Sequence, residues 1–128
     1  MGFRLKTSKK TKDIFEELSA SSNLKPFALC KIAISLSLNE NDPIDNFTRD
    51  TNGLELQRST VTGDYDAIFK CLMETYTGKS LTDDDYYPIH TKKHIDRGAE
   101  LLFSKYKYYG GNLEKFLTKI LNSEEESI

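Results

Sequence analysis

The chain opens on a short alternation of apolar and basic residues. In Phe3–Lys6 the apolar Phe3 and Leu5 alternate with Arg4 and Lys6, and a period of two is typical of a half-buried strand. We expect Phe3 and Leu5 to face a core and Arg4 and Lys6 to face outward. A strand this short needs a partner, and because the next segments are helical, a second chain could supply it.

A first helix is predicted to begin after Ser8, because a serine hydroxyl can accept a hydrogen bond from an unpaired N–H of the first turn. Ile14, Phe15 and Leu18 then lie on one face at helical spacing. The helix is expected to end near Asn23, since asparagine tolerates the left-handed conformation found just past helix ends.

A second helix is predicted from Pro26 to Leu38, and it is apolar on most of its faces. Pro26 suits a first helical turn, where its missing N–H costs nothing. The apolar positions are Phe27, Ala28, Leu29, Cys30, Ile32, Ala33, Ile34, Leu36 and Leu38. Such a helix is buried on most sides. We therefore expect it to serve a subunit interface as well as the core, and a single central core helix is the alternative.

Helices separated by turns are predicted for the rest of the chain. The pair Asn52–Gly53 predicts a short hairpin or an ordered loop, since both residues accept positive φ. Beyond it three helices are predicted, the first ending at Gly78 and the second at Gly110. Their apolar faces are Tyr65, Ile68, Phe69, Leu72, Met73 and Tyr76; Ile89, Ile95, Ala99, Leu102, Phe103 and Tyr106; and Leu113, Phe116, Leu117, Ile120 and Leu121.

These patterns predict a mainly α fold, in which a short N-terminal β-strand is followed by helices. We expect a single domain over residues 1–122, with a strand-helix-helix part at 1–39, a helical part at 40–122 and an acidic tail at 123–128. No apolar run approaches the ~18 residues of a membrane span, and no apolar segment of a secretory signal follows the basic N-terminus. A cytoplasmic protein without membrane association is expected.

The net charge of −2 conceals an asymmetry along the chain. Residues 1–31 hold seven Lys/Arg against three Asp/Glu, a charge of +4, and residues 32–128 hold eleven against seventeen, a charge of −6. This division suggests a basic binding face on an otherwise acidic protein, although a solvated helix face explains the charge equally well. Lysines in the first turn of the first helix also oppose the helix dipole. This small cost suggests an anion close by, although solvation alone could absorb it.

Evidence for catalysis is weaker. His90 and His94 are spaced like a metal-binding pair on a helix, and Asp83–Asp85 lies nearby in the sequence. However, no Glu follows His90 and two lysines separate the histidines, so we interpret both as structural or surface residues. We predict no catalytic residue, no metal site and no cofactor. The cysteines lack metal-finger spacing, and we expect both to be buried free thiols: Cys30 and Cys71.

Near the predicted end of the long helix, Tyr106, Tyr108 and Tyr109 alternate with Lys105 and Lys107. Interleaved aromatic and basic residues can bind single-stranded nucleic acid. We favour the simpler interpretation, in which the aromatic side chains dock a helix end against the core.

Three stretches of the chain resemble the DndE family of DNA sulfur-modification proteins: Leu24–Ala33, Gly53–Asp66 and His94–Gly98. The similarity covers roughly residues 3–105, and the middle stretch is its most specific part. The resemblance implies a homotetramer built on a ribbon-helix-helix-like unit with additional C-terminal helices. It also implies binding to duplex DNA, nicked or intact with a preference for nicks, and work beside the other Dnd proteins that install sulfur on the DNA backbone.

The candidate DNA-binding residues are the basic residues of the first 31 positions. In a ribbon-helix-helix unit, outward strand residues contact the DNA, the N-terminus of the second helix offers N–H groups to a phosphate, and lysines add phosphate attraction. The set is Arg4, Lys6, Lys9, Lys10, Lys12, Lys25 and Lys31. We expect a non-catalytic DNA-binding subunit. The alternatives are a DNA-nicking enzyme of the same system and a pure assembly adaptor for the other modification proteins.

Overall fold

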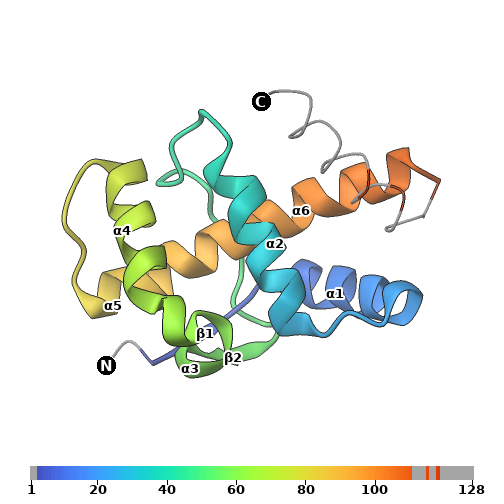
Figure 1. Cartoon of the computed structure of the whole chain (residues 1–128), viewed down its shortest axis with the longest axis horizontal. Helices are drawn as coiled ribbons and strands as arrows, with labels where there is room; N and C mark the ends of the chain where they lie inside the picture. Colours follow the sequence, from blue (N-terminus) through green and yellow to red (C-terminus); the bar gives the residue numbers. More distant parts are fainter. Residues whose placement is uncertain (1–2, 111–114, 116–117, 119–128) are drawn as a thin grey trace.

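The computed structural model of the chain describes residues 3–110, 115 and 118, and helices dominate it (Figure 1). The elements in chain order are β1 (Arg4–Lys6), α1 (Lys9–Ser22), α2 (Pro26–Leu38), β2 (Glu55–Gln57), α3 (Arg58–Val61), the 3-10 turn η1 (Gly63–Tyr65), α4 (Asp66–Thr77), α5 (Asp83–Asp85), the π-helical segment η2 (Tyr86–Thr91) and α6 (Lys92–Tyr108). The predicted fold class, mainly α with a short N-terminal strand, is confirmed.

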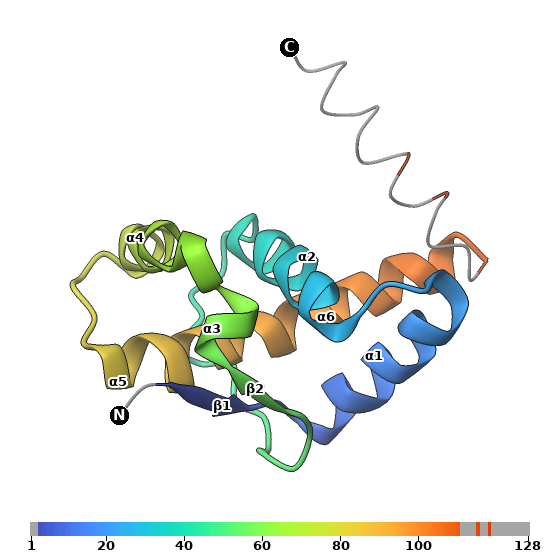
Figure 2. The same cartoon turned by 60° about the horizontal axis from the view of Figure 1, so that its bottom comes forward.

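The strand β1 finds its partner within the same chain. It pairs antiparallel with β2, with Leu5 opposite Leu56, so the hydrogen bonds of this ladder are formed within the chain (Figure 2). Gly53 lies in an ordered loop leading into β2, and its N–H donates to the Thr7 carbonyl at 2.9 Å. A Cβ at Gly53 would lie 2.0 Å from the Ser8 carbonyl oxygen. Only glycine therefore permits this loop to approach β1.

Phe3 does not face the core, contrary to the strand pattern. Leu5 is 2% exposed, whereas Phe3 is 61% exposed. Phe3 precedes the three-residue ladder, and its carbonyl accepts the backbone N–H of Arg58 at 2.8 Å. The apolar core therefore covers the side chain of Leu5 but not that of Phe3.

The core lies where α1, α2 and α6 meet. Apolar residues of α1 at the predicted positions are buried, namely Ile14, Phe15 and Leu18. The helix α2 crosses α6 so closely that a Cβ at Gly98 would lie 1.7 Å from the carbonyl oxygen of Ala33. Because α2 also contacts α1, α3 and α4, it is a central helix of this chain's own core.

The helices begin and end at the capping residues that the sequence predicts. The Ser8 hydroxyl caps α1 by accepting the N–H of Thr11 at 3.0 Å. Asn23 follows that helix with φ 63°, and Gly78 follows α4 with φ 77°. Pro26 is the first residue of α2. These side chains act within one turn of their own position, so the sequence alone identifies them.

The helix α4 buries less of its apolar face than its pattern predicts. Met73 is fully buried, but Tyr65, Ile68 and Leu72 are among the exposed large hydrophobic residues. Cys71 is also exposed, whereas Cys30 is buried as expected, and burial raises the pKa of the Cys30 thiol to about 12. The expectation of two buried thiols is therefore wrong for Cys71, because α4 lies at the outside of the fold (Figure 1).

The chain from α5 to α6 is one continuous helical path that starts at Asp83, and acidic residues in a first turn suit the helix dipole. The Thr82 hydroxyl caps α5 by accepting the N–H of Asp85. On α6 the predicted residues Ile95, Ala99 and Leu102 are fully buried. The predicted helix at 113–121 and the acidic tail at 123–128 lie outside the described residues. Within the part that the structure describes, none of the helices has the length and apolar character needed to cross a membrane.

Candidate nucleic-acid interface

The outward face of the strand pair is polar and carries two of the candidate residues. Arg4 and Lys6 are exposed on β1, beside the exposed Glu55 and Gln57 of β2. Arg4 Nη1 lies 3.4 Å from a Glu55 carboxylate oxygen. Lys6 has no acidic partner among the residues that the structure describes. The alternation predicted for this strand therefore holds at its outward positions.

The first turn of α1 adds three lysines. Lys9 Nζ lies 3.7 Å from Asp13, and Lys10 Nζ lies 3.6 Å from Glu100. Both lysine side chains are more than 60% exposed. Exposed ion pairs of this kind contribute little to stability, so a DNA phosphate can compete for these ammonium groups. Lys12 is half-buried.

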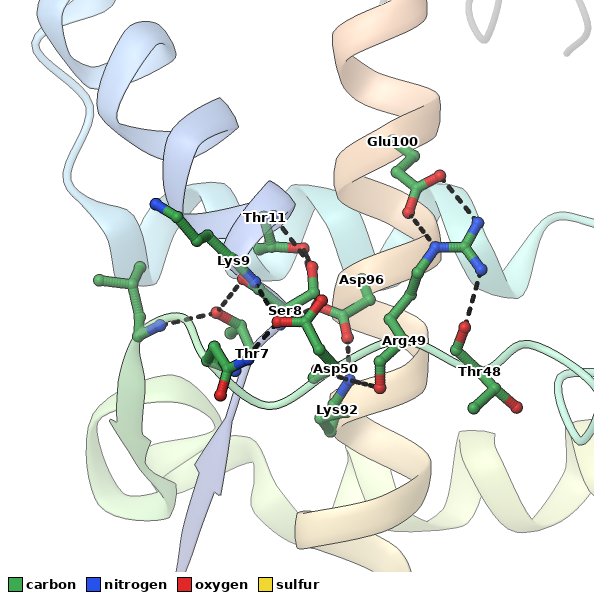
Figure 3. Close-up of polar contacts among 12 residues, drawn as sticks. Thr7, Ser8, Lys9, Thr11, Thr48, Arg49, Asp50, Lys92, Asp96 and Glu100 are labelled. Carbon is green, nitrogen blue, oxygen red and sulfur yellow. Dashed lines mark hydrogen bonds and ion pairs between the residues drawn. The ribbon is translucent and has the colours of Figure 1, made fainter.

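A buried carboxylate fixes the start of α1 (Figure 3). Asp96 of α6 accepts the backbone N–H of Ser8 at 3.0 Å and the Thr11 hydroxyl at 2.7 Å. Lys92, one turn earlier on α6, forms a short ion pair with the same carboxylate. Because Asp96 is fully buried, it needs these three partners, and they tie α1 to α6.

A second carboxylate reaches the same helix start from the loop before β2. Asp50 accepts the backbone N–H of Lys9 at 2.9 Å and that of Asn52 at 3.1 Å. These two hydrogen bonds lower the pKa of the Asp50 carboxyl. The lysines of this turn oppose the helix dipole, and Asp50 and Asp96 supply negative charge there from within the chain. The dipole argument therefore no longer requires an external anion at α1.

The start of α2 has a different character. Its N-cap residue is Lys25, no side chain caps the helix, and Pro26 occupies the first turn. Phe27 is partly exposed, and Lys31 Nζ lies 5.8 Å from the centre of its ring. Both views place this helix start beside β2 and α3 (Figures 1 and 2). An uncapped helix N-terminus beside a lysine is suited to binding a phosphate.

The family-like stretch Gly53–Asp66 contributes Arg58 and Asp66 to a second ion cluster. Arg58 donates to both Asp66 carboxylate oxygens, at 3.0 and 2.6 Å. Burial raises the pKa of Asp66, but hydrogen bonds from Arg58, Thr62 and Tyr86 outweigh it and keep the pKa below its usual range. These contacts join α3, α4 and η2, so the stretch holds the scaffold together.

The histidines considered for catalysis are engaged in packing. His94 is fully buried, and its Nδ1 lies 2.8 Å from the Ser37 hydroxyl. That hydroxyl accepts from Arg97 Nε at 2.9 Å, so we assign it as the donor to His94 Nδ1. Burial, reinforced by the Arg97 charge, lowers the pKa of His94 to about 3. His94 is a structural residue, as expected.

Of the acidic residues near these histidines in the sequence, Asp83 is paired with two cations. Asp83 accepts from Lys70 at 3.2 Å and from Arg58 at 3.3 Å. No group of three or more metal-ligating side chains lies together in the described chain. Reasoning from the sequence missed the polar residues that position α1 and α2, namely the exposed Asp50 and the buried Lys92, Asp96 and Arg97. The sequence offered a signal for two of them, because Asp96 and Arg97 stand between Ile95 and Ala99, two residues predicted for the core.

Comparisons with known proteins agree on one family. A model of the family "DNA sulphur modification protein DndE" matches residues 4–109. None of the curated proteins compared with the chain matches it. A crystal structure of DndE from Escherichia coli B7A, described as involved in DNA phosphorothioation modification, is similar with a TM-score of 0.64 and 16% identity, covering 78% of this chain and 95% of that one.

A DndE variant in which two glycines are replaced by lysine, described as involved in DNA phosphorothioation, has the same fold. Its TM-score is 0.62 at 16% identity, with 77% of this chain and 95% of that one covered. At this identity the two structures support the architecture, and the family match supports the assignment. The chain belongs to the DndE family of DNA sulphur modification proteins.

Proposed function

We propose that this chain is a non-catalytic DNA-binding subunit of a DNA phosphorothioation system. The observation that carries the proposal is that none of the seven basic residues of the first 31 positions is buried. They are Arg4, Lys6, Lys9, Lys10, Lys12, Lys25 and Lys31. Elsewhere the fold does bury cations, because Lys92 and Arg97 lie in the interior. The set is thus accessible to a polyanion, with five residues exposed and Lys12 and Lys31 half-buried.

Three kinds of contact contribute to the proposed binding. Arg4 and Lys6 face outward from the strand pair and contact groove edges or phosphates. The uncapped start of α2, with Lys25, receives a phosphate. The lysines of α1 neutralise further phosphates and release counterions. The preference for nicked duplex, the homotetramer and the other Dnd proteins as partners rest on the family resemblance.

The proposal is tested by fluorescence anisotropy with intact duplex, nicked duplex and single-stranded DNA at several salt concentrations. We expect the tightest binding to nicked duplex. On duplex DNA, log K should fall by ~0.9 per log unit of salt for each phosphate contact. Steep salt dependence would support contacts by several of the lysines.

Neutralising variants can be chosen so that no ion pair of the fold is lost. Lys6, Lys12 and Lys25 have no acidic partner among the described residues. Each change to Gln should reduce the salt slope by ~0.9 if that residue contacts a phosphate. Lys79→Gln is the matched control, since Lys79 is an exposed lysine just beyond α4. A triple variant combines the three Gln substitutions. If its DNA affinity and salt slope equal those of the wild type, the proposed interface is rejected.

The two alternatives give different results with the same protein. A nicking enzyme would relax supercoiled plasmid, with or without Mg²⁺, in catalytic amounts. A pure assembly adaptor would form oligomers and bind none of the three DNA forms. Stoichiometric DNA binding without relaxation is the outcome that the proposal requires.

A further inference from the structure

The end of α6 exposes an aromatic side chain that the core does not use. Tyr106 is docked, since it is buried and its hydroxyl donates to Ser21 of α1 at 3.3 Å. Tyr108, two residues later, is 81% exposed, the highest value among the exposed large hydrophobic side chains. Docking of the helix end therefore explains Tyr106 but leaves Tyr108 without a structural role.

The ring of Tyr108 is nevertheless held in place. Its centre lies 5.0 Å from that of the half-buried Tyr109, and the two rings are at 87° to each other. Edge-to-face contacts of this kind orient aromatic pairs. A ring that is both oriented and exposed offers a π-face to a flat ligand from solution.

Cationic side chains accompany the exposed ring. Lys105 lies one helical turn before Tyr108, on the same side of α6, and is exposed with no ion pair in the described chain. Lys107 Nζ lies 4.9 Å from the centre of the Phe103 ring and 3.5 Å from Glu17. The helix end therefore presents an open aromatic ring beside a lysine that has no ion pair with any described residue.

We propose that Tyr108 is a stacking platform for an unpaired nucleobase, and that Lys105 binds the adjoining backbone phosphate. Every base has a π-face, so stacking on tyrosine tolerates any sequence, and a nearby cation holds the backbone. The proposal rests on the DNA binding proposed above and adds a second, single-strand-specific contact on a different element.

The position of this site suits a strand that leaves a duplex bound at the basic strand and helix. The first turn of α1 carries Lys9, and its last turn meets α6 at Ser21. The 14 residues of α1 span about 20 Å at ~1.5 Å each. That length corresponds to about six nucleotides at the ~3.4 Å spacing of one strand. A short unpaired segment can therefore reach Tyr108 from the duplex.

The test compares a blunt duplex with the same duplex carrying a six-nucleotide single-stranded extension. The wild-type chain should bind the extended duplex more tightly. Tyr108→Ala should weaken binding of the extended duplex about fivefold or more, the usual effect of losing one base stack. Its affinity for blunt duplex should remain unchanged, and Tyr108→Phe, which keeps the ring, should behave as wild type.

Two further variants complete the design. Tyr65→Ala removes another exposed tyrosine, 61% exposed at the start of α4, and should leave both affinities unchanged. Lys105→Gln should lower the salt slope of the single-stranded contribution by ~0.7. Suppose that the wild-type chain binds blunt duplex and that Tyr108→Ala does not change the affinity for the extended duplex. That result would overturn this inference alone. Wild-type chain that binds neither DNA would overturn the proposed function as well.

Discussion

Successive residues of α6 make separate long-range contacts that hold three parts of the molecule. His94 pairs with the last turn of α2, and Asp96 binds the start of α1. Arg97 donates to the carbonyls of Ser37 and Asp42, and Gly98 permits the close crossing with α2. The short His94–Gly98 stretch that helped identify the family thus serves the scaffold, while the candidate DNA contacts lie elsewhere.

Burial of His94 makes stability depend on pH in a defined window. The folded pKa of about 3 lies below the ~6.5 of an unfolded histidine, so between these values the unfolded chain binds more protons. Stability therefore falls as pH falls through this window and is unaffected by His94 above it. From this residue we expect the free energy of unfolding to be about 2 kcal/mol lower at pH 5 than at pH 7.

Urea unfolding at both pH values checks this expectation. His94→Gln keeps an oxygen that can accept from Ser37 but does not titrate, so the difference between pH 5 and 7 should shrink by about 2 kcal/mol. His90→Gln is the control. Burial lowers the pKa of His90 too, so that variant measures the separate contribution of His90 to the pH dependence of stability. An identical pH dependence in wild type and His94→Gln would contradict the assignment.

Gly98→Ala separates local preference from tertiary contact. Helix propensity alone predicts that alanine stabilises a helix by about 1 kcal/mol relative to glycine. The close approach to the Ala33 carbonyl predicts a loss of about 3 kcal/mol instead, because backbone must move. Thermal or urea unfolding decides the sign. Ser104→Ala, at an exposed position of the same helix, should change stability by less than about 0.5 kcal/mol.

The helices α1 and α2 differ in how the backbone N–H groups of their first turns are capped. The N-terminus of α1 is closed by the Ser8 hydroxyl and by the carboxylates of Asp96 and Asp50. That of α2 begins at Lys25 without a side-chain cap. An uncapped, positively charged helix start is less stable than a capped one, and it suits a ligand that supplies the missing anion.

This contrast predicts a variant that is more stable but binds DNA less tightly. Lys25→Ser adds an N-cap hydroxyl and removes a charge that opposes the dipole, so the free energy of unfolding should rise by about 1 kcal/mol. The same change should weaken duplex binding and lower the salt slope by ~0.9. Lys25→Gln is the matched control, because it should weaken binding without the gain in stability. A Lys25→Ser variant with undiminished binding would exclude a phosphate at α2.

At the scale of the whole molecule, scaffold and proposed interface draw on different residues. Buried polar contacts join α6 to α1, α2 and the loop before β2, whereas the proposed DNA contacts lie at the surface of β1, α1 and α2. Several large apolar side chains remain exposed, including Phe27, Ile68 and Leu72. Exposed apolar side chains that lie together favour association between proteins.

Association of four chains is the state that the family resemblance implies. Light scattering should then give a mass of about 59 kDa, four times the 14.7 kDa of one chain, and the mass should fall on dilution only if the subunits dissociate. The described fold has a core of its own, so a stable monomer at every concentration is the contrary outcome and would reject the tetramer.

Much of the fold could be predicted because its signals act over one or two turns. The Ser8 cap, the Asn23 and Gly78 helix ends and the buried stripe of α1 depend on residues at most four positions apart. The candidate interface could be nominated for a similar reason, since its basic residues are clustered within 31 positions. Whether an apolar position is covered depends on distant elements, and Phe3 and Cys71 were therefore predicted incorrectly.

The sequence by itself determined the helices, their ends and the family, because local patterns and short motifs encode them. Only the tertiary structure decided the pairing partner of β1, the contacts of Asp96 and the difference in capping between the N-termini of α1 and α2. Ser8 and Asp96 are 88 positions apart, and Leu5 lies opposite Leu56. Contacts at such separations form only when the chain has folded, since burial brings together polar groups that must then satisfy one another.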